Sequence, residues 1–273
     1  MSGNEKIMLK IDNAVKTFFK GLPQEHTVLN NLSLELKEGD FVSVVGSNGA
    51  GKSTLFNAIC GTFFLDGGAV LLDGKDITYQ PDFRRAKWIG RVFQDPMKGT
   101  APNLTIEENL ALAYSRIKKH ALAPAISSKE IKLFRERLAT MEMGLEDRMK
   151  TKVGLLSGGQ RQVVTLMMCT LNTPKLLLLD EHTAALDPQT SEKIMEITNR
   201  IVKENNLTTM MITHNLNAAL TTGNRTIMMD EGNIILDIHE EERKGMSLED
   251  LLNMYSQKSN RVFDNDRILL QKK

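Results

Sequence analysis

Gly46-Ser47-Asn48-Gly49-Ala50-Gly51-Lys52-Ser53 matches the phosphate-loop pattern G-x-x-x-x-G-K-[ST], and this stretch decides the fold. The apolar run Phe41–Val45 before it predicts a buried strand, and Thr54–Cys60 after it predicts a helix. Strand, glycine-rich loop and helix in this order are the structural context that the pattern requires. We therefore interpret the stretch as a nucleotide phosphate site.

The residue types of this loop suit a bound phosphate chain. Glycines let the backbone wrap closely around phosphates, and successive N–H groups at a helix start supply positive potential. Lys52 offers a point charge to the outer phosphates, and the Ser53 hydroxyl is a candidate Mg²⁺ ligand. The candidate nucleotide contacts are Gly46, Ser47, Asn48, Gly49, Ala50, Gly51, Lys52, Ser53 and Thr54.

Two adjacent acids follow a second apolar strand. Leu176–Leu179 ends in Asp180 and Glu181, and ligand crevices of open α/β sheets lie at such carboxyl ends of strands. We interpret Asp180 as a water-mediated Mg²⁺ contact and Glu181 as the base that takes a proton from an attacking water. A solvated pair of loop acids is the alternative interpretation.

Composition narrows the class of protein. The 273 residues carry 35 Lys and Arg against 34 Asp and Glu, so the net charge of +1 argues against a dedicated nucleic-acid binder. Two cysteines, Cys60 and Cys169, cannot form a disulfide framework and suit a reducing cytosol. The longest apolar runs fall far short of the roughly 20 residues of a membrane-spanning helix. Any work at a membrane would therefore go through a partner.

Hydrophobic patterning predicts an α/β fold. Apolar strands separated by helices after Gly159 indicate a parallel sheet that is buried on both faces. The first part of the chain instead alternates, with Ile7, Leu9 and Ile11 on one face of a strand. The stretch Leu104–Gly144 is helix-forming and begins at a capping box of Thr105 and Glu108. Further strands are predicted at 69–72, 88–93, 175–179 and 208–213, a hairpin at 227–236, and a last helix capped by Ser247.

Leu156-Ser157-Gly158-Gly159-Gln160, upstream of a strand that ends in Asp180-Glu181, resembles the signature of the ATP-binding-cassette ATPases. The resemblance extends from about Ile7 to Leu236. Other elements of the family follow in order: Gln94 resembles the glutamine loop, Ala185-Leu186-Asp187 the D-loop, His214 the switch histidine, and Phe18 the aromatic that stacks on adenine.

The resemblance implies a P-loop NTPase cassette with a parallel core sheet, an antiparallel β portion and a helical subdomain. We expect a single ATPase domain over residues 1–273, with the helical subdomain at about 95–160 and a C-terminal extension at about 237–273. It also implies ATP and Mg²⁺ as ligands. In the family, ATP lies in a head-to-tail dimer between the phosphate loop of one subunit and the signature of the other. Here the signature residues would be Ser157, Gly158, Gly159 and Gln160, and Asp187 of the D-loop is a further candidate nucleotide contact.

Catalytic and metal roles carry over residue by residue. The resemblance implies that Glu181 is the base, that His214 holds the γ-phosphate, and that Gln94 contacts Mg²⁺ and the attacking water. The implied metal ligands are Ser53, Gln94 and Asp180. A structural role for His214 and a core role for Phe18 are the alternatives. His182 stands where the family usually has proline or alanine, and we expect a surface residue without a catalytic role.

One phosphate loop, one signature and no long coiled coil favour the ATPase subunit of a bacterial transporter over a soluble translation or repair ATPase. The implied partners are transmembrane permease subunits, a second copy of the chain, and a solute-binding protein that acts through the permease. The protein would sit peripherally on the cytoplasmic face of the cell membrane. The permease would dock in a groove beside Gln94, at Asp95–Thr105.

The stretches Gly46–Asn57, Gly74–Thr78 and Leu104–Leu110 resemble the ATPases of branched-chain amino-acid importers. Asp180–Pro188 resembles a bacterial subgroup that is paired with a binding protein and a branched-chain-type permease and is linked to aromatic amino acids. An exporter or a lipoprotein-release ATPase is the alternative. The sequence leaves open the transported molecule, the direction of transport, homodimer against sibling heterodimer, and the roles of the C-terminal segment and of His182.

Overall fold

The computed structural model describes residues 6–116 and 126–259, which fall into two units. The first unit comprises Met1–Arg85 and Thr208–Lys273, and the second comprises Ala86–Leu207. Residues 117–125 of the predicted helical stretch and 260–273 of the predicted C-terminal extension lie outside the described residues, as do residues 1–5. Among the described residues, none of the helices has both the length and the apolar character that crossing a membrane requires.

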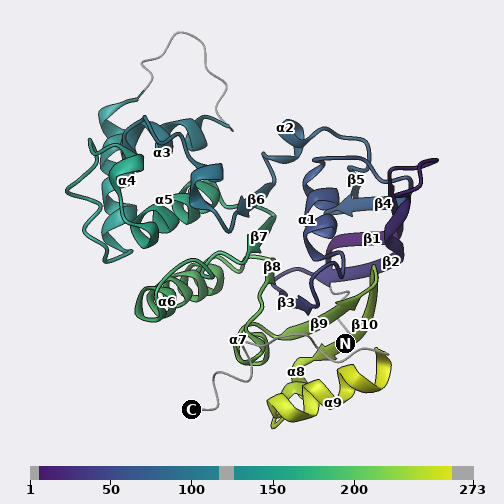
Figure 1. Ribbon diagram of the computed structural model, residues 1–273. Helices are drawn as coiled ribbons and strands as arrows, with labels where there is room; N and C mark the ends of the chain where they lie inside the picture. The colour runs from purple at the N-terminus through teal and green to yellow at the C-terminus, as the bar shows by residue number, and fades with distance from the viewer. Residues whose placement is uncertain (1–5, 117–125, 260–273) are drawn as a thin grey trace. The chain divides into compact units, whose positions relative to one another are not determined.

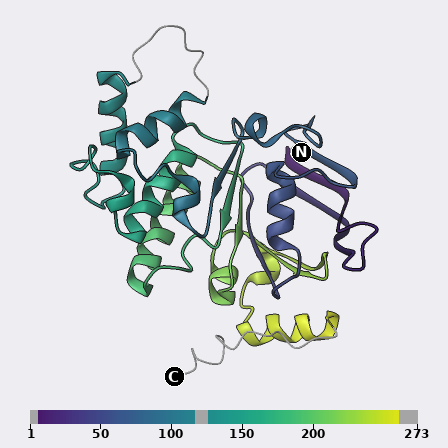
Figure 2. The ribbon, with the colours of Figure 1, turned by 45° about the horizontal axis from the view of Figure 1, so that its top comes forward.

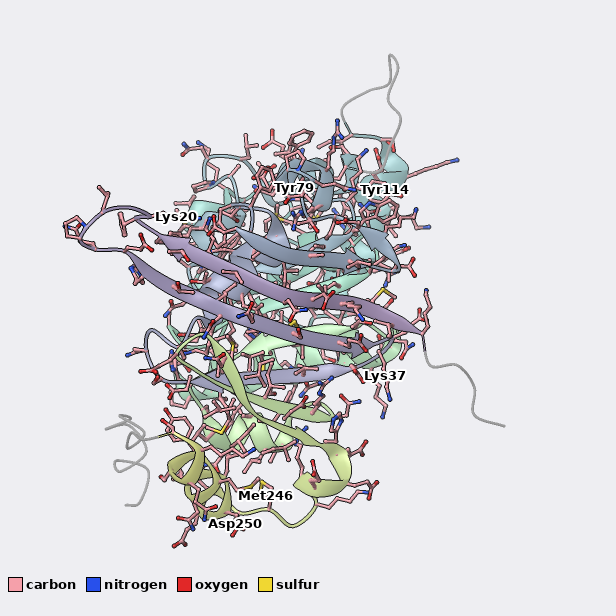
Figure 3. All side chains as sticks on the ribbon, turned by 90° about the vertical axis from the view of Figure 1, so that its right-hand side faces the viewer. Lys20, Lys37, Tyr79, Tyr114, Met246 and Asp250 are labelled. Carbon is pink, nitrogen blue, oxygen red and sulfur yellow. The ribbon has the colours of Figure 1, made fainter. Side chains whose placement is uncertain are left out.

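The first unit contains an antiparallel sheet with the strand order β2-β1-β4-β5. Its two long strands lie side by side, and Figure 3 shows them running between the labelled Lys20 and Lys37. Leu9 pairs with Leu36 and Ile11 with Leu34, and all four side chains are buried. The predicted alternation is therefore confirmed at these positions, although Ile7 is exposed. The bounds are β1 Ile7–Phe18, β2 His26–Lys37, β4 Gly67–Leu72 and β5 Lys75–Asp76.

A second set of strands in the first unit carries the phosphate loop. Strand β3 (Phe41–Gly46) lies between β8 (Thr209–Ile212) and β9 (Arg225–Asp230) and is parallel to both. Every residue of these three strands is buried, which explains the apolar runs Met210–Ile212 and Ile227–Met229 within them. Strand β10 (Asn233–His239) pairs with β9 as the predicted hairpin.

Helices complete the first unit. The helix after the phosphate loop is α1, and α9 packs on β10 and α7 with Leu251 and Tyr255 fully buried. Figures 1 and 2 both show α9 beside the β9–β10 hairpin. Ser247 caps α9 as predicted, because its hydroxyl accepts from the backbone N–H of Asp250. The bounds are α1 Lys52–Cys60, α2 Asp82–Arg85, α7 Leu216–Thr221, α8 Glu240–Arg243 and α9 Leu248–Lys258.

The second unit joins a parallel strand pair to a group of helices. Strands β6 (Ile89–Val92) and β7 (Leu176–Asp180) run in register from Ile89 opposite Leu176 to Val92 opposite Leu179. Helix α5 packs against α3, α6 and β6. The helices are α3 Ile106–Ser115, α4 Ser128–Ala139, α5 Gly158–Thr170 and α6 Pro188–Glu204, with short 3₁₀ turns η1 Pro96–Gly99 and η2 Val153–Leu155. The helical subdomain predicted at about 95–160 lies inside this unit, and its bounds stay a prediction.

Capping boxes fix the starts of several helices. The hydroxyl of Thr105 accepts from Glu108 N–H, and the Glu108 carboxylate accepts from Thr105 N–H at 2.7 Å, as the sequence predicted. Boxes at Ser127, Ser157 and Ser247 start α4, α5 and α9. Each box satisfies N–H groups that a helix leaves without an internal partner. These helix starts are therefore encoded within four consecutive residues.

Candidate nucleotide-binding site

The phosphate loop is a tightly wound connection between β3 and α1. Gly46 has φ +153°, and a Cβ placed on it would lie 2.2 Å from the carbonyl oxygen of Met229. Gly51 has φ +99°, and its Cβ would lie 2.8 Å from the carbonyl oxygen of Val28. A side chain at either position would displace backbone. The spacing of these glycines therefore reflects close approach of neighbouring strands as well as room for a phosphate chain.

Lys52 lies inside the curve of this loop. Its Nζ donates to the carbonyl oxygens of Gly46 and Ser47 at 2.8 and 2.9 Å, and its side chain is buried. The N-cap residue of α1 is Gly51, which has no side chain to accept a hydrogen bond. The first turn of the helix, which contains Ser53 and Thr54, therefore has no side-chain cap. A helix start of this kind, next to a buried ammonium group, attracts anions.

His214 and Phe18 also belong to the first unit. His214 is half-buried and follows β8, the parallel neighbour of β3. His214 and the phosphate loop therefore both follow the carboxyl ends of neighbouring parallel strands. Phe18 ends β1, and its ring meets Phe63 edge-on with 5.5 Å between ring centroids. Lys16 Nζ lies 5.5 Å from the Phe18 ring centroid. Phe18 thus belongs to an aromatic cluster beside the loop between β1 and β2.

In the second unit, Asp180 ends β7 and is paired with a cation. Its Oδ2 accepts from Arg91 Nη2 at 2.6 Å, and the two side chains are 14% and 12% exposed. The Arg91 guanidinium carbon also lies 4.7 Å from the centroid of the Phe93 ring. Sequence reasoning missed Arg91, because it lies within an apolar run and its partner comes from the neighbouring strand. Gln94 follows β6 and is exposed. Gln94, Asp180 and Glu181 therefore lie at the carboxyl ends of adjacent parallel strands.

Glu181 has a left-handed backbone conformation, with φ +49°. Such a conformation is uncommon for a residue with a side chain and persists where the surroundings enforce it. The Glu181 carbonyl oxygen accepts from Ala184 N–H at 3.0 Å, which closes a turn directly after β7. The candidate base therefore sits at a sharply bent position rather than on a regular strand.

The expectation that His182 is a surface residue is wrong. Its side chain is only 2% exposed, and Nε2 lies 3.2 Å from Oγ1 of Thr198 on α6. That hydroxyl donates to the carbonyl oxygen of Ile194 at 2.8 Å, so its proton is committed and His182 must donate from Nε2. Burial lowers the pKa of His182 to about 4. The imidazole is neutral at pH 7 and fastens the Glu181 turn to α6.

The signature and the D-loop meet at two helix starts. Ser157 caps α5, with its hydroxyl 3.3 Å from the N–H of Gln160. Asp187 caps α6 by accepting from Thr190 N–H at 3.0 Å, and this hydrogen bond lowers the pKa of Asp187. A Cβ on Gly159 would lie 2.3 Å from Thr190 Cγ2. The glycine therefore allows the start of α5 to pack on the start of α6. Ser157 and Gly158 are exposed there.

The structure thus brings the predicted residues together in groups within each unit. The first unit holds the phosphate loop Gly46–Thr54 with His214 beyond the next strand. The second unit holds Gln94, Asp180 and Glu181 at one strand edge, and Ser157–Gln160 with Asp187 at the helix starts. Among the residues that the structure describes, no three His, Cys, Asp or Glu side chains form a cluster suited to a metal ion.

The ABC transporter family model matches residues 29–184, which is more than half of the chain. A tyrosine transport ATP-binding protein of Clostridioides difficile (strain R20291) is 43% identical over 248 residues, which cover 91% of this chain and 98% of that protein. The chain belongs to the ABC transporter family. The family resemblance read from the sequence is therefore confirmed, and the ATP-binding cassette of this family is an ATPase.

Solved structures agree with this assignment. A dimeric ATP-binding cassette in a post-hydrolysis state with ADP and Pi matches with a TM-score of 0.73 and 32% identity, over 85% of this chain and 99% of that one. A nucleotide-free ATP-binding cassette from an ABC transporter matches with a TM-score of 0.74 and 27% identity, over 91% and 98% of the two chains. The predicted cassette fold, with parallel strands, an antiparallel β portion and helices, is confirmed.

Proposed function

We propose that this cassette is the ATPase subunit of a transporter that imports amino acids, with an aromatic amino acid as the favoured substrate. The observation that carries the proposal is the 43% identity to a tyrosine transport ATP-binding protein over nearly the whole length of both chains. The alternative is an export or lipoprotein-release ATPase. The substrate itself would be chosen by a permease and a solute-binding protein, which are the proposed partners.

Phosphate binding would rest on the loop and its lysine. The N–H groups of Gly46–Thr54 and the ammonium group of Lys52 would bind the outer phosphates of ATP. Ser53, Gln94 and Asp180 would hold Mg²⁺, and hydroxyl, amide and carboxylate oxygens are the donors that this cation prefers. When bound, the ion would neutralise phosphate charge. The Arg91 contact at 2.6 Å keeps the Asp180 carboxylate in a fixed orientation.

Hydrolysis would use the residues at the strand ends. Glu181 would take the proton from the attacking water, Gln94 would contact that water, and His214 would hold the γ-phosphate. The fixed turn at Glu181, with His182 buried behind it, supports this role because a base must be held within hydrogen-bond reach of its proton. Phe18 would stack on the adenine ring.

A second copy of the chain would complete the site. Ser157, Gly158, Gly159, Gln160 and Asp187 would act on the ATP held by the partner's phosphate loop. The exposed start of α5 at Ser157 supports this arrangement, because it offers a helix dipole and N–H groups to an anion outside the subunit. Docking to the permease, at the cytoplasmic face of the membrane, would use Asp95–Thr105. Asp95 caps the turn η1 there, 2.9 Å from Met97 N–H.

Uptake assays in a deletion strain test the proposal. Cells that lack the gene are complemented with the parent, with Lys52→Ala or with Glu181→Gln, and uptake of labelled tyrosine, leucine and spermidine is compared. We expect the parent alone to restore tyrosine uptake, with leucine weaker and spermidine unchanged. Unchanged uptake of every amino acid, with efflux or lipoprotein release affected instead, would assign the cassette to an exporter.

A further inference from the structure

The turn between β9 and β10 braces the phosphate loop from behind. Gly232 donates its N–H to the carbonyl oxygen of Ala50 at 3.1 Å, and its own carbonyl oxygen accepts from Asn30 N–H at 3.1 Å. The carbonyl oxygen of Met229 lies against Gly46, where a Cβ would approach to 2.2 Å. This hairpin therefore forms part of the backbone on which the loop rests, and a shift of the hairpin would shift the loop.

Asp230 joins this turn to two serine hydroxyls. It is 8% exposed, its Oδ1 lies 3.3 Å from Ser47 Oγ in the phosphate loop, and its Oδ2 lies 2.8 Å from Ser259 Oγ. Ser259 is 4% exposed and directly follows α9. A buried carboxylate is costly unless donors satisfy it. The two hydroxyls supply such donors, so Asp230 connects the end of the C-terminal helix to the phosphate loop.

Helix α9 holds Ser259 firmly in place. Leu251 and Tyr255 are fully buried against Leu236 and Ile238 of β10. Ser259 N–H donates to the Tyr255 carbonyl oxygen at 2.7 Å, which fixes the residue to the last turn of the helix. Figure 3 shows the start of this helix at the labelled Met246 and Asp250, below the hairpin. The position of the Ser259 hydroxyl is thus set by apolar packing of the whole helix.

We propose that Asp230 is a positioning residue of the phosphate loop, and that α9 sets its position through Ser259. The proposal deepens the proposed function, because it rests on ATP binding at the loop. When α9 is docked, both carboxylate oxygens of Asp230 are fixed and Ser47 is held for phosphate binding. By thermodynamic reciprocity, ATP on the loop stabilises the docked helix to the same degree. Helix α9 with Ser259 is then a control element for nucleotide affinity.

Steady-state kinetics and ATP binding of the full-length chain test the link. Ser259→Ala removes one donor, and we expect KM and Kd for ATP to rise about 3- to 10-fold, as for loss of one hydrogen bond, with kcat within about twofold of the parent. Ser259→Thr keeps a hydroxyl and should restore the parent values. Ser256→Ala is the matched control, because Ser256 lies on the same helix and its hydroxyl donates to the Leu252 carbonyl oxygen.

Amide hydrogen exchange tests the link from the other end. We expect ATP to slow exchange of the α9 amides in the Glu181→Gln protein, where hydrolysis is blocked. Adding Ser47→Ala leaves the packing of α9 untouched and should abolish this slowing at saturating ATP.

Three outcomes separate failure of the link from failure of the proposed function. Unchanged KM in Ser259→Ala, or slowing of α9 exchange that survives Ser47→Ala, would overturn the link while ATP binding stands. Failure of the parent itself to bind ATP would overturn the proposed function and this inference together.

Discussion

Replacing His182 should remove a large part of the acid sensitivity of the second unit. In the folded chain the pKa of His182 is lowered from its ordinary value of 6.5 to about 4 by burial. Above pH 6.5 the imidazole is neutral in both the folded and the unfolded chain. Between pH 6.5 and 4 only the unfolded chain takes up the proton, so the free energy of unfolding falls as the pH falls. Below pH 4 both states are protonated.

The expected magnitude follows from the size of that pKa difference. Each pH unit in the interval is worth about 1.4 kcal/mol, so the parent should lose about 3 kcal/mol between pH 6.5 and pH 4 through this one group. His182→Gln keeps an N–H donor toward Thr198 without a titrating group. The variant should be less stable than the parent at pH 7. Because glutamine does not titrate, the variant should lose correspondingly less free energy of unfolding on acidification.

Urea unfolding of the protein without nucleotide is a suitable assay. The chain has a single tryptophan, Trp88, which lies in the second unit together with His182. Its fluorescence should follow unfolding of that unit at pH 7.5, 6, 5 and 4. His26→Gln is the control, since His26 is exposed and lies in the first unit. Equal loss of stability on acidification in the parent and in His182→Gln would refute the assignment of a buried, neutral imidazole.

Three further predictions concern the nucleotide site. Lys52→Ala should weaken ATP binding together with turnover, whereas Glu181→Gln should bind ATP as the parent does and lose about 10²- to 10⁴-fold in hydrolysis rate. ATP affinity and hydrolysis rate measured on the same preparations check this, and near-parent hydrolysis by Glu181→Gln would place the base elsewhere. Glu181→Gln should form a dimer in sedimentation when ATP and Mg²⁺ are added and should return to the monomer with a chelator; a monomer with bound nucleotide would argue against ATP shared between two copies. Gly46→Ala should abolish measurable ATP binding, because the new Cβ would meet the Met229 carbonyl oxygen at 2.2 Å and displace the loop; parent-like affinity in this variant would show that the hairpin behind the loop yields easily.

Local sequence was sufficient for the elements of the site. The strand Phe41–Gly46, the glycine loop and helix α1 are specified by residues that are neighbours in the chain, and their type was predictable from patterning. The same holds for the capping boxes at Thr105 and Ser247. Strand order was not predictable in this way. The placement of β3 between β8 and β9 depends on packing between segments more than a hundred residues apart in the chain.

The side-chain pairs that sequence reasoning missed are long-range in the same sense. Arg91 and Asp180 are 89 residues apart and meet because their strands are neighbours. Asp230 meets Ser47 across 183 residues. The prediction for His182 failed for a different reason. A polar residue after a strand normally faces water, but here the hydroxyl of Thr198 on the following helix α6 forms a hydrogen bond with the buried imidazole. Periodicity reports which face of an element is buried, and it carries no information about which polar side chains meet inside.

The capping role of Ser157 restricts how this position can vary during evolution. Helix starts accept Ser, Thr, Asp and Asn almost equally well, so the fold alone would tolerate several replacements of the serine whose hydroxyl lies 3.3 Å from Gln160 N–H. A carboxylate at the same place would repel the phosphate of a nucleotide brought by a partner, and an alanine would leave the first turn of α5 uncapped. With the proposed contact to the partner's nucleotide, two separate selections, one for folding and one for anion recognition, would act on a single oxygen atom. Drift at residue 157 should be confined to small uncharged side chains that can still cap the helix, even in lineages where the transported substrate changes freely.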